Sequence, residues 1–266
     1  MIRPARAASA ALLLLLAPVA LHAQERRSER AFTLDERVPA GQWLRVRNVI
    51  GEVRVSPSSS DRVEIVATKS WRRGDPKMVR IETTKSSDGS ILVCAFWQEN
   101  ATCDEHGYDS HGDSHSRNND VAVDFDVRVP RGVNVGAFSV NGQVSVEGAT
   151  AQVEAGTVNG NVDATSSGGP VEANTVNGNV HARMGRLGGS DDLAFNTVNG
   201  NVVAEFGEDI DANIELSTVN GRFQTDWPVT VTGRLDPRHL RATLGKGGRR
   251  LRLATVNGNV ELRKAP

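Results

Sequence analysis

Hydrophobic and polar residues alternate along most of the chain. The clearest example is segment 121–129, where valines and a phenylalanine occupy every second position and Pro130 follows. A period of two is typical of extended strands with one buried face, and proline marks the end of such a strand. The same alternation predicts further strands at 44–55, 63–67, 79–81 and 91–93. The pattern therefore predicts an all-β protein.

One short phrase, Ser/Thr-Val-Asn-Gly, occurs six times in the second half of the chain. Its Asn-Gly pairs are Asn141-Gly142, Asn159-Gly160, Asn177-Gly178, Asn199-Gly200, Asn220-Gly221 and Asn257-Gly258. The spacings between successive asparagines are 18, 18, 22, 21 and 37 residues, which indicates a repeat architecture. Because glycine adopts positive φ freely and asparagine tolerates it, we interpret each pair as a tight turn between two short strands.

Two architectures agree with this repeat. In a β-solenoid, a single stack of short coils, equivalent residues lie above one another about 4.8 Å apart, so each Asn-Gly corner repeats and asparagine contacts asparagine. In an antiparallel β-meander only the turn itself would require Asn-Gly, and the preceding Thr-Val would be free to vary. The near-identity of the whole phrase favours the solenoid, and the meander stays as the alternative.

The start of the chain is typical of an export signal. Arg3 and Arg6 precede an apolar run at 10–21, and Ala23 offers a small residue for cleavage, so residues 1–23 are predicted to be a signal peptide rather than an uncleaved anchor. No later segment is apolar enough to cross a membrane as a helix. We therefore expect an exported protein, periplasmic or at the cell surface or secreted.

The expected mature chain has three parts. Residues 24–40 are charged without periodicity and are predicted to be a flexible leader. Residues 41–130 form a degenerate N-terminal β-repeat part, and residues 131–266 form the solenoid of Thr-Val-Asn-Gly repeats. A polar, His-rich loop at 94–120 interrupts the N-terminal part.

Cysteines and histidines gather in that loop. In an oxidising compartment Cys94 and Cys103 are expected to form a disulfide, with a free thiol pair or a metal pair as alternatives. Imidazole and carboxylate groups together suit zinc, nickel or copper. The candidate metal ligands are His106, His111, His115, Asp109 and Asp113. Their spacing matches no standard site, so a solvated polar loop is the alternative interpretation.

Charge and composition exclude several classes of function. The 31 Lys and Arg nearly balance the 32 Asp and Glu, which gives no electrostatic reason to expect a nucleic-acid partner. The glycines around Lys246 lack the spacing of a phosphate loop. The charged residues Glu172, His181, Arg183 and Glu205 repeat no catalytic arrangement, so we expect no enzyme activity and no cofactor, with a divergent polysaccharide-active enzyme as the less favoured alternative.

Three features together resemble a known family. They are the segment Asn48–Val55, the phrase Val127-Arg128-Val129-Pro130-Arg131-Gly132-Val133, and the serial repeats that end at Asn257-Gly258. The chain is similar over about residues 40–264 to the bacterial putative-adhesin family of exported β-strand-repeat proteins. That resemblance implies a non-catalytic adhesion or interaction scaffold at the bacterial envelope, with an envelope or surface protein or a glycan as partner. The alternative is a periplasmic metal-binding or envelope-stress sensing protein that uses loop 103–115.

Overall fold

The computed structural model describes residues 25–110, 119–185, 192–207, 210–231, 236 and 238–265. The expected signal peptide, residues 1–23, lies outside them. Apart from one 3-10 turn, η1 (Pro76–Met78), the regular structure of the described residues is β-strand, which confirms the all-β prediction. No helix in this part of the chain has the length and hydropathy that crossing a membrane requires.

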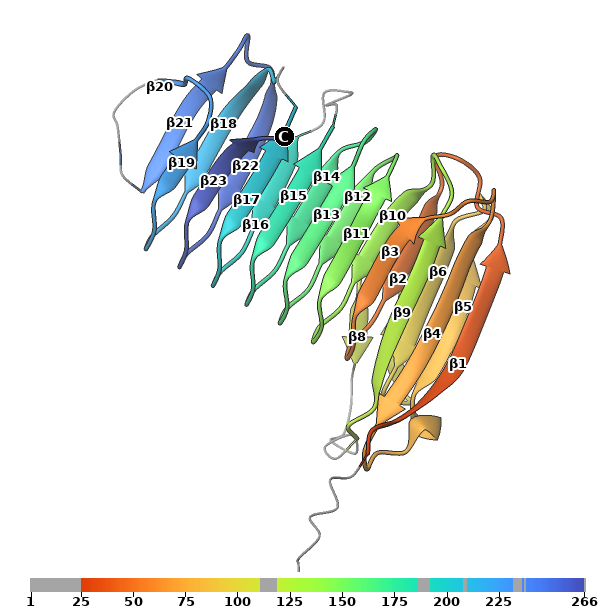
Figure 1. Cartoon of the computed structure of the whole chain (residues 1–266). Coiled ribbons are helices and arrows are strands. Elements are labelled where there is room, and N and C mark those ends of the chain that lie inside the picture. Colours follow the sequence, from red (N-terminus) through yellow and green to blue (C-terminus); the bar gives the residue numbers. More distant parts are fainter. Residues whose placement is uncertain are drawn as a thin grey trace, which may run out of the picture.

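The strands form an elongated stack of two large sheets (Figure 1). Sheet 1 contains, in spatial order, β1 (Arg27–Glu36), β4 (Val63–Trp71), β9 (Ala122–Val129), β3 (Val53–Pro57), β11 (Val144–Ala149), β13 (Val162–Ser166), β15 (Val180–Met184), β17 (Val202–Phe206), β23 (Val260–Lys264) and β19 (Phe223–Thr225). Sheet 2 contains β20 (Thr230–Val231), β21 (His239–Leu244), β18 (Ala212–Ser217), β22 (Arg249–Ala254), β16 (Leu193–Asn196), β14 (Val171–Asn174), β12 (Val153–Gly156), β10 (Asn134–Phe138), β2 (Trp43–Arg47), β6 (Ile91–Phe96) and β5 (Arg80–Lys85). A small separate hairpin consists of β7 (Ala101–Cys103) and β8 (Tyr108–Ser110).

Each coil of the repeat region contributes one strand to each sheet. From β12 in sheet 2 the chain passes a corner at 157–161 into β13 of sheet 1, and residues 167–170 return it to β14 in sheet 2. Equivalent strands of successive coils pair in parallel, for example β11 with β13 and β13 with β15. A meander would pair them antiparallel, so the long parallel sheets favour stacked coils as in a solenoid.

The core between the sheets is built mainly from columns of identical residues. In sheet 1 the register aligns Val162, Val180, Val202 and Val260, each of which has an exposed fraction of 0%. Burying one such valine stabilises the fold by about 1.5–3 kcal/mol. The alternation seen in the sequence is therefore the alternation between this core and the outer faces of the sheets.

The spatial order of the coils differs from their order in the sequence. The last coil, β22 and β23, lies between the coil of β16 and β17 and the coil of β18 and β19. After β19 the chain runs through β20 and β21, which pairs antiparallel with β18, and then returns to fill the inner position. At the other end, β2 and β3 likewise lie between β6 and β9 on one side and β10 and β11 on the other. Neither exchange was predicted from the sequence.

The prediction of a flexible leader at 24–40 was wrong for most of this segment. It contains β1, which pairs antiparallel with β4 from Arg27 opposite Trp71 to Glu36 opposite Val63. Phe32 and Leu34 pack against the core. Its charged side chains are mostly exposed on this edge strand, where charge opposes pairing with another chain.

The expected disulfide is present. It joins Cys94 of β6 to Cys103 of β7, with 6.4 Å between the two Cα atoms. The bridge ties the β7–β8 hairpin to sheet 2 near the N-terminal end of the stack.

Candidate functional site

Each residue of the corner phrase Thr-Val-Asn-Gly has a different structural role. The threonine is buried, and its hydroxyl donates to the glycine carbonyl of the neighbouring coil, as in Thr157 to Gly142 (2.9 Å) and Thr175 to Gly160 (3.0 Å). The asparagine is exposed, and its side-chain amide nitrogen donates to the side-chain oxygen of the asparagine one coil nearer the N-terminal end of the stack. These amide contacts follow the order Asn141, Asn159, Asn177, Asn199, Asn257 and Asn220, at 2.7–2.9 Å. Such a ladder holds adjacent coils in register.

The reason for the glycine differs from the one expected. No residue other than glycine has positive φ among the described residues. Of the corner glycines, Gly178, Gly200 and Gly258 have φ of 157°, 154° and 155°, close to fully extended, whereas Gly142 and Gly160 have no positive φ. Instead, a Cβ atom at Gly160 would lie 2.2 Å from the carbonyl oxygen of Gly142, and one at Gly142 would lie 1.9 Å from that of Gly51. Glycine is required here because the backbones of stacked coils approach closely.

The valine of the phrase points to solvent. Val158, Val176, Val198, Val256 and Val219 have exposed fractions of 38%, 39%, 39%, 39% and 49%. With the asparagines beside them, these residues form a straight line along the stack, which we call the valine–asparagine ridge. Strands in a sheet lie about 4.8 Å apart, so the ridge repeats the same two side chains at that interval.

The outer face of sheet 1 carries a cluster of paired charges. His181 faces a carboxylate with each ring nitrogen: Nδ1 lies 3.4 Å from Asp163 and Nε2 lies 3.2 Å from Glu205. The hydrogen bond to Asp163, and to a lesser degree the one to Glu205, raises the pKa of His181 despite partial burial. Burial by itself raises the pKa of Glu205, but hydrogen bonds from Arg183 (2.7 Å) and from His181 outweigh it, so this pKa lies below its ordinary value. The cluster links three neighbouring coils.

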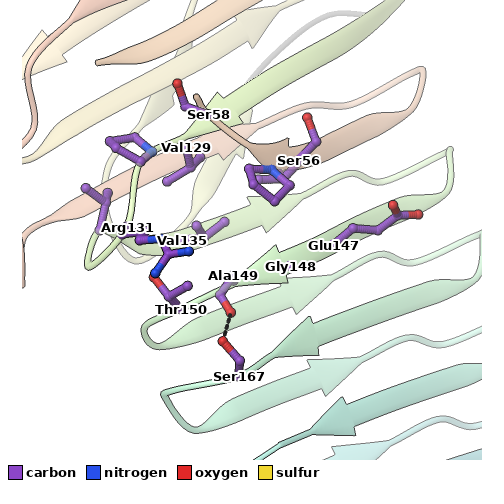
Figure 2. A pocket seen from close by; sticks show the side chains of 14 residues that line it. Ser56, Ser58, Val129, Arg131, Val135, Glu147, Gly148, Ala149, Thr150 and Ser167 are labelled. Atoms are coloured by element: carbon purple, nitrogen blue, oxygen red, sulfur yellow. Dashed lines mark hydrogen bonds between the residues drawn. The ribbon is translucent and has the colours of Figure 1, made fainter. Parts of the chain in front are cut away.

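A cavity of about 290 Å³ lies at the opposite corner from the ridge, near the N-terminal end of the stack (Figure 2). Val55, Val133 and Val135 line it from the core side. The exposed residues Arg131 and Glu147 also line it. Figure 2 shows Arg131 beside Thr150 at one end of the hollow and Glu147 at the other end, with its carboxylate directed away from Arg131. The cavity was not predicted from the sequence, although Arg131 belongs to the Val-Pro-Arg-Gly phrase that carries the family resemblance.

The candidate metal ligands are only partly described. His111, Asp113 and His115 lie outside the described residues. The side chain of His106 is 84% exposed, and no group of three His, Cys, Asp or Glu side chains suited to a metal occurs in the described part of the chain. The metal site therefore stays a prediction.

The start of this loop is fixed to sheet 2 by Arg47. Its Nε donates to the Asp104 carbonyl at 2.8 Å, and its second guanidinium contact is to the Glu105 carbonyl. The guanidinium also lies 4.5 Å from the ring centre of Phe138, which is within range of a cation–π contact. Arg47 therefore positions the loop structurally, and its charge is directed at the protein's own backbone.

Stacked two-strand coils with one exposed side-chain line define a class of all-β repeat proteins. The chain belongs to the Toastrack DUF4097 family, whose sequence profile matches residues 51–263. This membership confirms the expected family. No curated protein matches the sequence significantly.

Two solved structures illustrate the similarity. A structure described as a putative cell adhesion protein from Clostridium sporogenes is 10% identical, with 91% of this chain and 99% of that chain covered and a TM-score of 0.40. One described as a putative adhesin from Bacteroides fragilis is 11% identical, with 91% and 99% covered and a TM-score of 0.34.

Proposed function

We propose that the protein is a non-catalytic adhesion or interaction scaffold of the bacterial envelope and that the valine–asparagine ridge is its contact surface. The exposed valines carry this proposal. A side chain that is about two-fifths exposed leaves much apolar surface in water, yet the same apolar residue occupies this position in five coils. A row of apolar groups beside hydrogen-bonding amides combines the two kinds of contact that protein interfaces use.

The side-chain hydrogen bonds between neighbouring coils support the same proposal. Asparagine and threonine bonds at every corner hold the ridge rigid, so a partner that binds it meets side chains that are already in place. Preorganisation lowers the entropic cost of binding. The disulfide supports an exported location, because disulfides form and persist in oxidising compartments.

The test compares two purified triple variants in binding to immobilised envelope fractions. In the first, Val158, Val176 and Val198 are replaced by lysine, which removes about 1 kcal/mol of apolar contact at each position and adds charge. In the matched control, lysines replace Ser28, Thr33 and Thr83, which are exposed polar residues of strands away from the ridge. Both variants add the same charge.

The ridge variant should bind at least tenfold more weakly than the unaltered protein, and the control variant should bind normally. Equal binding by all three proteins, or an equal loss in both variants, would reject the ridge as the contact surface. Circular dichroism and urea unfolding of each variant establish that the stack is intact.

A further inference from the structure

Positive charge is concentrated at one tip of the molecule, where β1 begins and β4 ends. Arg27 at the start of β1 lies opposite Trp71 at the end of β4, so segments 25–30 and 69–78 meet there. These segments carry seven Lys and Arg against three Asp and Glu, although the whole chain is almost neutral. We call them the basic tip, and its cations are Arg26, Arg27, Arg30, Lys69, Arg72, Arg73 and Lys77.

Most of these cations have no acidic partner. Of the acids, Glu29 lies opposite Lys69 in the pairing of β1 with β4. At the other end of β1 charge is paired as well, since Asp35 contacts Arg62. By contrast, five side chains of the tip are exposed and form no ion pair with any described residue, namely Arg26, Arg27, Arg30, Arg72 and Lys77. The basic tip therefore presents positive charge to its surroundings.

Two acidic side chains near the tip are engaged by the main chain. The Asp120 carboxylate accepts hydrogen bonds from the N–H groups of Arg72 (3.1 Å), Arg73 (3.2 Å) and Gly74 (2.7 Å). The bond from Gly74 contributes most to a pKa of Asp120 below its ordinary value. Asp75 caps η1 by accepting from a main-chain N–H of that turn at 2.9 Å. These bonds fix the loop that carries the two arginines.

An exposed apolar side chain accompanies these charges. Met78 ends η1 and is 48% exposed, and among the described residues the other exposed large hydrophobic side chains are the valines of the ridge. Lys69 Nζ donates to the Pro76 carbonyl at 2.8 Å and so holds η1 against the end of β4. Figure 1 shows the end of β4, the start of β1 and the orange coil of η1 projecting beyond the line of coil corners, where a flat surface can reach them.

We propose that the basic tip binds the surface of an anionic phospholipid bilayer. Its Lys and Arg side chains contact the lipid phosphates, and Met78 enters the boundary between headgroups and acyl chains. Clusters of about four to eight cations recognise anionic lipids in this way. Met78 favours a bilayer over a soluble polyanion, because an apolar side chain gains nothing from a partner that stays hydrated.

Sedimentation with lipid vesicles tests the basic tip. The unaltered protein should bind vesicles of equal parts phosphatidylglycerol and phosphatidylcholine at least tenfold more tightly than vesicles of phosphatidylcholine alone. Raising the salt concentration from about 0.1 M to about 1 M shortens the screening length from about 10 Å to about 3 Å and should release the protein. These vesicles contain no protein or glycan, so the result does not depend on the valine–asparagine ridge.

Two triple variants with the same loss of charge locate the contact. Arg26→Gln, Arg27→Gln and Arg72→Gln together should weaken binding to the anionic vesicles at least tenfold. The matched control should bind like the unaltered protein, and its glutamines replace three exposed arginines at the other end of the stack (Figure 1), Arg238, Arg250 and Arg252. Met78→Gln should weaken binding at least threefold and leave its salt dependence unchanged. Circular dichroism and urea unfolding establish that each variant is folded.

Equal binding to both kinds of vesicle, an equal loss in the two triple variants, or full binding by the tip variant would overturn the proposal. So would heparin that binds the unaltered protein as tightly as the vesicles do while Met78→Gln changes neither, because the tip would then recognise soluble polyanions. Failure of this test leaves the proposed scaffold function standing, since the ridge variants test that function separately.

Discussion

Replacing Gly160 by alanine tests whether close backbone approach, rather than backbone conformation, requires the corner glycines. The added Cβ atom would lie 2.2 Å from the Gly142 carbonyl oxygen, where ordinary contact needs about 3.4 Å, so the two coils must separate by about 1 Å. Several hydrogen bonds join these two coils, and three of them involve Gly142 or the amide pair of Asn141 and Asn159. These three run from Gly142 N–H to the Asn159 carbonyl (3.0 Å), from Thr157 Oγ1 to the Gly142 carbonyl (2.9 Å), and from Asn159 Nδ2 to Asn141 Oδ1 (2.9 Å).

At about 1 kcal/mol for each hydrogen bond, Gly160→Ala should lower the free energy of unfolding by about 3 kcal/mol. Two control variants separate the causes. Gly41 has a φ of 83° and nothing lies within 4 Å of the position that a Cβ atom would take, so Gly41→Ala should cost only the conformational penalty of about 1–2 kcal/mol. Gly185 lacks positive φ and its added Cβ atom would lie 3.5 Å from the nearest neighbour, so Gly185→Ala should be neutral or stabilise by about 0.5 kcal/mol.

Urea unfolding followed by far-ultraviolet circular dichroism measures all three variants on the same scale. We expect Gly160→Ala to have the lowest midpoint, Gly41→Ala an intermediate one, and Gly185→Ala the highest. If Gly160→Ala costs no more than Gly41→Ala, coil-to-coil contact does not explain the glycines.

Three further predictions concern the charge cluster, the asparagine ladder and the disulfide. The pKa of His181 is raised above its ordinary value of 6.5, so the stability that its charged form contributes is complete below pH 6.5 and is lost as the pH rises through the raised pKa. In the His181→Gln variant, the midpoint of urea unfolding should therefore change less with pH across this range. Asn177→Ala removes two ladder hydrogen bonds and should cost about 1–2 kcal/mol in urea unfolding, whereas Asn141→Ala at the ladder's end removes one and should cost about half as much. Replacing Cys94 and Cys103 by serine should lower the free energy of unfolding by about 2–3 kcal/mol, as expected for a bridge between cysteines nine positions apart. A smaller effect in thermal or urea unfolding would show that other contacts mainly hold the β7–β8 hairpin.

Part of the fold could be predicted because the same short phrase recurs at each corner of the coils. Alternation indicated the strands, and the recurrence of Thr-Val-Asn-Gly indicated coils that stack in parallel. The segment before β2 was mispredicted because its charged residues on an edge strand resemble those of a disordered leader. Nothing local in residues 27–36 shows that β4 lies beside them.

The sequence by itself determined the unit of this protein: a coil with a valine core, a buried threonine, an exposed valine and an asparagine at the corner. It could not determine which coil stacks on which, because identical corners accept one another equally well, and only the return of the chain through β21 places β22 and β23 inside the stack. The cavity likewise depends on tertiary structure. Its walls come from segments 55–58, 129–135 and 147–150 and from Ser167, whose residues carry no shared local pattern and meet only when the sheets have formed.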